Sequence, residues 1–196
     1  MTKVGVTGGI GSGKTYVCRI FETFGIPIYY ADDRARQLME EDAVLVEQLK
    51  QHFGEEIYSN GVLERALLAA KVFNNKEALA VLNSLVHPAV FRDTVRWAEE
   101  HTNAPYTIKE AALLYETGSY KQLDKIIVVT ASLEERISRV ILRDNTTREQ
   151  IIARIANQMD EQEKIKLADY VIYNDASHSV EDQVKAIHQI LLNNSK

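Results

Sequence analysis

The sequence predicts an α/β fold, a three-layer sandwich in which helices cover a central parallel sheet. Three observations favour it. Apolar Val4 and Val6 indicate a short buried strand that leads into a glycine-rich loop and a helix. The run K-I-I-V-V-T at Lys125–Thr130 is typical of a strand buried on both faces. Residues 34–101 instead have helical periodicity, which predicts a helical insert between strands.

The composition limits the possible classes of protein. The chain has 196 residues, enough for one α/β domain with an inserted subdomain. Lys and Arg total 23 against 28 acidic residues, and this net charge of −5 argues against a nucleic-acid partner. The one cysteine, Cys18, excludes an internal disulfide framework and is expected in the core. With no secretory signal and no apolar stretch of membrane-spanning length, we expect a cytoplasmic protein without a membrane partner.

The first functional signal is the glycine-rich loop after the first strand. Residues 8–15, G-G-I-G-S-G-K-T, match the phosphate-binding pattern G-x-x-x-x-G-K-[ST] of P-loop NTPases at every fixed position. Glycines let consecutive N–H groups face one anion, and the following helix, 16–24, adds the positive end of its dipole. We expect Lys14 to reach the β- and γ-phosphates of ATP and the Thr15 hydroxyl to hold Mg²⁺. The other expected ATP-binding residues here are Gly8, Gly9, Gly11, Ser12, Gly13 and Tyr16.

Acidic residues follow the second strand, which we expect at Ile26–Tyr30 with Pro27 near its start. Because the carboxyl ends of parallel strands line the ligand crevice, Asp32 or Asp33 is placed to orient or deprotonate an attacking hydroxyl. Either residue would also suit the N-cap of the next helix, and the spacing leaves both roles open.

The helical insert supplies two candidate polar residues, Arg65 and His87. The spacing does not distinguish a ligand-binding His87 from a hydrogen-bonded structural histidine. We expect Pro88 in the first turn of a helix at 83–97. An apolar helix face is expected from residues that recur every fourth position, namely Leu45, Leu49 and Phe53.

The chain then returns to the sheet at residues 105–114. Glu110 is the carboxylate placed to orient Mg²⁺ through water, and an exposed position on an edge strand is the alternative. A last strand is expected at 168–174, and Ser179 should cap a terminal helix. The inward residues of that helix are predicted to be Val180, Val184, Ile187 and Leu191.

Between these strands, Ser132 and Glu135 form a capping box that opens a helix. Its arginines Arg136, Arg139 and Arg143 share one face, which in an acidic protein suggests a clamp for transferring phosphates, although at least one of them is expected to be merely solvated. A second box at Thr146–Glu149 predicts another helix towards Gln158. We expect residues 136–160 to form a helical lid that excludes water. The opposite face of the first helix should be apolar, through Leu133, Ile137, Val140 and Ile141.

Motifs along the whole chain occur together in one known family. They are T-G-G-I-G-S-G-K-T at 7–15, A-D followed by A-R within 31–36, G-V-L-E-R at 61–65, L-N-S-L-V-H-P at 82–88, L-L-Y-E at 113–116, R-V-I-L-R-D at 139–144 and A-D-Y-V-I-Y-N at 168–174. In this order they resemble the dephospho-coenzyme A kinase family, which uses ATP to phosphorylate the ribose 3′-hydroxyl of dephospho-CoA.

The resemblance implies roles for single residues. Asp32 would position or deprotonate the ribose hydroxyl, Arg139 would stabilise the migrating phosphoryl group, and Thr7 would lie against the reacting groups. Arg143 would belong to the lid and contact ATP. The remaining implied roles are Arg65 and His87 in the dephospho-CoA pocket and Asn174 near the adenine of ATP.

The resemblance also implies a division of the chain. Residues 1–33 and 104–196 would form the nucleotide-binding core and 34–103 the acceptor subdomain, in a monomer or weak homo-oligomer. Three positions depart from the family pattern: Tyr30 replaces an Asp, Ala112 a Pro and Tyr16 a common Thr. The alternative is another small-molecule P-loop kinase, acting on a nucleoside monophosphate or a sugar acid. A GTP-dependent switch would need N-K-x-D, which Asn75–Ala78 fails to match.

Overall fold

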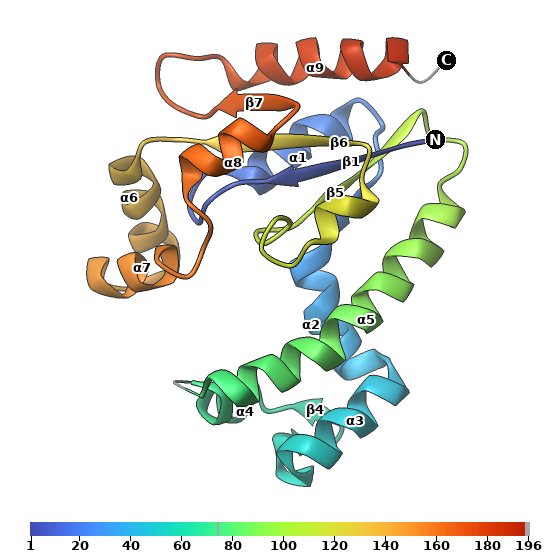
Figure 1. Ribbon diagram of the computed structural model, residues 1–196, viewed down its shortest axis with the longest axis vertical. Helices are drawn as coiled ribbons and strands as arrows, with labels where there is room; N and C mark the ends of the chain where they lie inside the picture. Colours follow the sequence, from blue (N-terminus) through green and yellow to red (C-terminus); the bar gives the residue numbers. More distant parts are fainter. Residues whose placement is uncertain (74, 195–196) are drawn as a thin grey trace. The chain divides into compact units, whose positions relative to one another are not determined.

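The computed structural model describes residues 1–73 and 75–194, and within this range the chain forms two compact units (Figure 1). Residues 1–30 and 101–196 make the first, which we call the core unit. Residues 31–100 make the second, the insert unit.

The core unit is built on a five-stranded sheet in the order β2-β5-β1-β6-β7, with every neighbouring pair parallel. The central strand is β1, and its Val6 pairs with Glu110 on one side and Ile127 on the other. Helices flank this sheet, which confirms the predicted fold class. The strands are β1 (Thr2–Thr7), β2 (Ile28–Tyr30), β5 (Tyr106–Glu110), β6 (Lys125–Thr130) and β7 (Tyr170–Tyr173).

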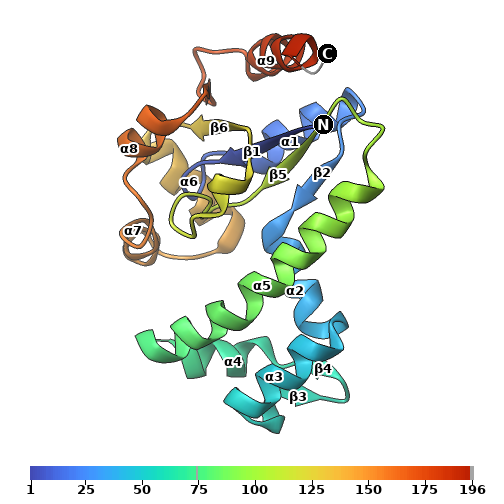
Figure 2. The same ribbon diagram turned by 45° about the vertical axis from the view of Figure 1, so that its right-hand side comes forward.

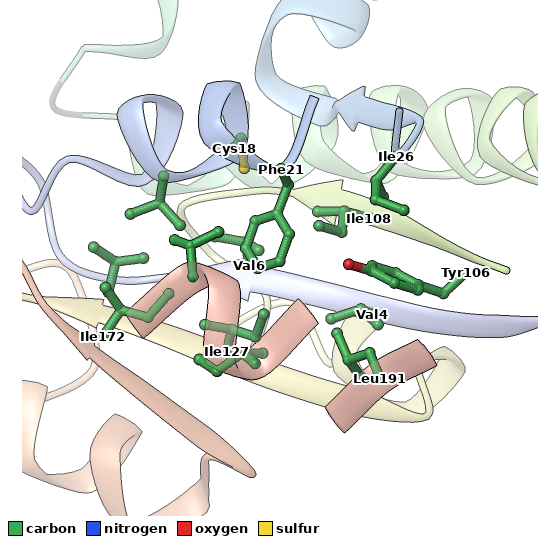
Figure 3. Close-up of a cluster of buried hydrophobic side chains, with 14 of the residues drawn as sticks. Val4, Val6, Cys18, Phe21, Ile26, Tyr106, Ile108, Ile127, Ile172 and Leu191 are labelled. Carbon is green, nitrogen blue, oxygen red and sulfur yellow. The ribbon is translucent and has the colours of Figure 1, made fainter. Parts of the chain in front are cut away.

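Helices α1 and α9 pack on one face of the sheet. Their side chains converge on alternate strand residues, with Phe21 of α1 and Leu191 of α9 meeting Val4, Val6 and Ile127 (Figure 3). Cys18 is fully buried there, as predicted, and the four expected inward residues of α9 are buried as well. The helices of this unit are α1 (Lys14–Thr23), α6 (Leu133–Asp144), α7 (Arg148–Ile155), α8 (Glu161–Leu167) and α9 (Val180–Asn194), with a 3₁₀ turn at Ser119–Gln122.

The insert unit is mainly helical (Figure 2). It has its own apolar core. Leu45, Leu49 and Phe53 are buried in it, which confirms the predicted helix face. A short antiparallel hairpin, which the sequence patterns did not predict, turns at Asn60 and Gly61, both with positive φ. The elements are α2 (Ala31–Glu41), α3 (Ala43–Phe53), a 3₁₀ turn (Glu55–Ile57), β3 (Tyr58–Ser59), β4 (Val62–Leu63), α4 (Arg65–Val72) and α5 (Lys76–Glu100).

Two predictions about helix starts are wrong. Pro88 does not lie in a first turn but inside α5, which runs from Lys76 to Glu100. A proline removes only one intrahelical hydrogen bond, and burial of Val86 and Ala89 on either side stabilises the continuous helix. The second capping box is shifted by one residue, because Thr147 is the N-cap and Gln150 is the residue that reaches back to it.

The apolar face of α6 is also narrower than expected. Ile137 and Val140 are buried, but Leu133 is 49% and Ile141 38% exposed. Helix α7 ends at Ile155, before the predicted Gln158. Across residues 1–73 and 75–194, none of the helices is long and apolar enough to pass through a membrane.

Candidate functional site

The glycine-rich loop leaves the carboxyl end of β1, the central strand, and runs into α1. Gly11 has a φ of 80° and Gly13 a φ of 95°, values in the left-handed region that favours glycine. A Cβ atom at Gly11 would lie 2.3 Å from the carbonyl oxygen of Arg136, and one at Gly13 would lie 2.1 Å from Nδ2 of Asn174. The loop therefore packs so closely on α6 and on the segment after β7 that only glycine fits at these positions.

The residues that follow the loop begin α1. Lys14 is the first residue of the helix, and its Nζ donates to the carbonyl oxygen of Gly8 at 3.2 Å. The ammonium group therefore lies over the loop, where a bound anion would benefit from both its charge and the helix dipole. Thr15 and Tyr16 are exposed in the same turn. The Tyr16 hydroxyl donates to Glu181 of α9, and this bond raises the pKa of Tyr16.

Two other predicted residues, Arg139 and Asn174, meet at this loop. Arg139 donates to the carbonyl oxygen of Ser12 at 3.4 Å and, more closely, to that of Asn174 at 2.8 Å. The Asn174 amide in turn donates to the Ser12 carbonyl oxygen at 2.8 Å. Residues from α6 and from the segment after β7 are thus brought together on the glycine-rich loop.

Arg143 does not join this cluster. Its side chain is 63% exposed, and it pairs with Asp144 through Nε at 2.6 Å. Hydrogen bonds from Arg143 and then from Arg154 hold the pKa of Asp144 down at about 2. Nε and one terminal nitrogen of Arg143 are thus occupied by Asp144, while most of the side chain is open to solvent.

Arg136 is not part of a phosphate-facing stripe, so the expected clamp of three arginines is wrong at this position. Its side chain is only 6% exposed. Nε donates to the carbonyl oxygen of Ile10 at 3.0 Å, and one terminal nitrogen donates to Glu161 at 2.9 Å. The Arg136 side chain therefore binds the backbone of the phosphate loop at Ile10.

The carboxyl ends of β1 and β5 place two more predicted residues. Thr7 is fully buried, and its hydroxyl donates to the carbonyl oxygen of Ala112 at 3.4 Å. Glu110 ends β5 and is 6% exposed. Because β5 lies between β2 and β1, the alternative of an exposed edge residue is wrong for Glu110. The Cys18 thiol has a pKa raised well above its usual range, first by burial and then by Glu110.

The remaining predicted residues belong to the insert unit. Asp32 is exposed in the first turn of α2, as is Asp33, which pairs with Arg36 at 2.7 Å. Both acids lie inside the helix, so the N-cap alternative is wrong for them. Arg65, the first residue of α4, pairs with Glu40 at 3.1 Å. His87 is exposed in α5.

Other groups that contact or surround the loop were not predicted from the sequence. Gln158, in the connection between α7 and α8, accepts a hydrogen bond from the Ile10 N–H at 3.0 Å. The neighbouring Met159 N–H donates to Glu116 at 2.8 Å, and the buried Lys164 pairs with the same carboxylate. Burial alone would raise the pKa of Glu116, but these two bonds hold it below its usual value. No local sequence signal marks such contacts, because their partners are far apart in the chain.

Comparisons with known proteins agree on one family. Residues 2–180 match the family model described as dephospho-CoA kinase. The dephospho-CoA kinase of Bacteroides fragilis (strain YCH46) is 36% identical over 182 residues, which are 93% of this chain and 89% of that protein. A Thermus thermophilus protein of known crystal structure superposes with a TM-score of 0.83 at 36% identity, covering 98% of this chain and 97% of the other. The dephospho-CoA kinase from Campylobacter jejuni superposes with a TM-score of 0.74 at 27% identity, covering 99% and 98%.

Proposed function

Because the chain belongs to the dephospho-CoA kinase family, we propose that it transfers the γ-phosphoryl group of ATP to the ribose 3′-hydroxyl of dephospho-CoA, giving coenzyme A and ADP. The observation that carries this proposal is the family match over residues 2–180, which includes the phosphate loop and all of the insert unit. The positive φ angles of Gly11 and Gly13 and the helix that begins at Lys14 support a triphosphate site at this loop.

We assign ATP binding to the core unit. The phosphate loop, Gly8 to Gly13, would surround the triphosphate, and Lys14 would exchange its bond to Gly8 for the β- and γ-phosphates. Asn174 already contacts the loop and would extend the site towards the adenine. Tyr16 and Arg143 would complete the contacts, Arg143 after releasing Asp144.

The chain also offers donors that suit Mg²⁺. Among the described residues no group of three or more His, Cys, Asp or Glu gathers in one place. Mg²⁺ in kinases does not need one, because it is held by one or two protein oxygens together with phosphates and water. The Thr15 hydroxyl and, through water, the buried Glu110 carboxylate are the oxygens we assign to it. When bound, the ion neutralises charge on the phosphates.

Catalysis would rest on alignment and charge neutralisation, because phosphoryl transfer needs little covalent help from the protein. Lys14 and Arg139 would stabilise negative charge on the migrating group. Asp32 would accept or orient the proton of the ribose hydroxyl, and its exposure in the first turn of α2 leaves it accessible for this role. Thr7 would lie against the reacting oxygens.

We assign recognition of dephospho-CoA to the insert unit, with Arg65 and His87 in its pocket. The pair of Arg65 with Glu40 is partly exposed, at 57% and 32%, and would cost little to exchange for a substrate anion. Residues 136–160 would act as the lid, and the protein would work as a monomer or a weak homo-oligomer.

The decisive experiment is a coupled assay of ADP release. Purified protein with ATP and Mg²⁺ is given dephospho-CoA, AMP, gluconate or shikimate in separate reactions. We expect turnover with dephospho-CoA and at most trace turnover with the other acceptors. A higher kcat/KM for AMP or for a sugar acid would instead support the alternative of another small-molecule kinase. The product is then identified by mass spectrometry as coenzyme A.

A further inference from the structure

Ile10, at the outer side of the phosphate loop, is held at every group it possesses. Its N–H donates to Gln158 at 3.0 Å, and its carbonyl oxygen accepts from Nε of Arg136 at 3.0 Å. Its side chain packs against the small apolar cluster of the predicted lid, made by Ile137, Val140, Ile151 and Ile155.

These contacts come from both ends of the predicted lid, residues 136–160. Arg136 is near its start, on α6, and Gln158 is near its end, between α7 and α8. Gln158 is itself held in place, because the next residue, Met159, donates its N–H to Glu116 at 2.8 Å. Arg136 is equally fixed, since its second contact is the ion pair with Glu161 at 2.9 Å.

We infer that Gln158 and Arg136 are positioning residues for ATP binding, which act by fixing the two peptide groups that flank Ile10. The Ile10 N–H is directed to Gln158 and the Ser12 N–H to the carbonyl oxygen of Gly9, so neither faces a phosphate in this arrangement of the loop. Removal of the Gln158 acceptor would leave a half-buried N–H without a partner and allow the peptide to rotate. Such a rotation would change the shape of the phosphate loop and weaken ATP binding, but it would not affect binding of dephospho-CoA.

This inference rests on the proposed function, and the experiment separates the two. The full-length variants Gln158→Leu, Gln158→Glu and Arg136→Lys are compared with the wild type. Gln162→Leu is the matched control, because Gln162 is exposed in α8 only four residues away. KM is measured for ATP and for dephospho-CoA, ATP dissociation constants are measured by calorimetry without acceptor, and Tm is recorded for each protein.

We expect Gln158→Leu to raise both the KM and the Kd for ATP about tenfold, equivalent to ~1.4 kcal/mol, and to leave KM for dephospho-CoA within about twofold. Gln158→Glu keeps an acceptor oxygen but adds a negative charge near the triphosphate, so it should lose clearly less ATP affinity than Gln158→Leu. Gln162→Leu should stay close to the wild type. Arg136→Lys keeps the charge opposite Glu161 but displaces the Nε donor, so it should repeat the selective loss for ATP. It carries the test if Gln158→Leu does not fold.

Three results would overturn the inference: an unchanged ATP Kd in Gln158→Leu, an equal rise in both KM values together with a lower Tm, or a loss in Gln158→Glu as large as in Gln158→Leu. If the wild type binds ATP but does not phosphorylate dephospho-CoA, the proposed function fails while the ATP Kd values still decide the role of Gln158.

Discussion

Gly11→Ala should destabilise the protein more than an alanine substitution at another glycine with a similar positive φ. The new Cβ would meet backbone atoms of Arg136, 2.3 Å from O and 2.9 Å from C. Backbone atoms of a helix do not move aside easily, so overpacking should cost ~1–3 kcal/mol. The left-handed φ of 80° adds ~1–2 kcal/mol for a residue with a side chain. We therefore expect a loss of ~2–5 kcal/mol in the free energy of unfolding.

The matched control is Gly25→Ala. Gly25 has a similar φ of 75°, and nothing lies within 4 Å of its would-be Cβ. Both substitutions reduce the entropy of the unfolded chain equally, so the difference between them isolates the steric term. That difference should be ~1–3 kcal/mol in urea titrations followed by far-UV circular dichroism. If Gly11→Ala is no less stable than Gly25→Ala, the loop does not pack on α6 as described.

Three further predictions concern the reaction and the pH dependence of stability. Arg139→Ala should lower kcat by about 10² or more in the coupled assay, which is the effect of losing one charge-stabilising donor. The control Lys166→Ala removes an exposed cation and should leave kcat unchanged. Unchanged turnover in Arg139→Ala would exclude Arg139 from the mechanism. Asp32→Asn should impair transfer but leave the Kd for ATP nearly unchanged, and a collapse of ATP affinity would make Asp32 structural. His188 is buried beside the Tyr106 hydroxyl, and burial lowers the pKa of His188. The unfolded chain therefore binds the proton more readily, so the free energy of unfolding falls as the pH drops below about 6.5. His188→Gln should make this fall less steep in urea titrations from pH 7 to 5. An unaltered slope would assign the fall to other groups.

The sequence predicts well those structural features that depend on interactions between residues close together in the chain. The capping box of Ser132 with Glu135 forms as expected, because its partners are three residues apart. The strand Lys125–Thr130 has the predicted bounds, since a β-branched run has few alternatives. The second box failed by one residue, because Thr146 and Thr147 are both good caps and only the reach of the Gln150 side chain decides between them.

The features it predicts poorly depend on residues far apart in the chain. The spacing of Arg136, Arg139 and Arg143 correctly places them on one helix, but Glu161 decides which one is buried. Glu110 is buried inside the sheet because β5 lies between β2 and β1. The periodicity of a single segment does not predict the order of strands. The grip of Gln158 on Ile10 spans 148 residues and leaves no local pattern.

Local opening of the core around Cys18, the single cysteine of this chain, can be measured by thiol labelling. Cys18 lies in α1, four residues after Lys14, and is fully buried with a pKa well above its usual range, raised first by burial. A thiol reagent can therefore react only when the core around Cys18 opens, so the labelling rate reports the population of that open state. Ligand binding at the start of the same helix should slow labelling by a factor of 1 + [ligand]/Kd. The Kd for a nucleotide can thus be measured by labelling Cys18 in the wild-type protein, without an introduced probe.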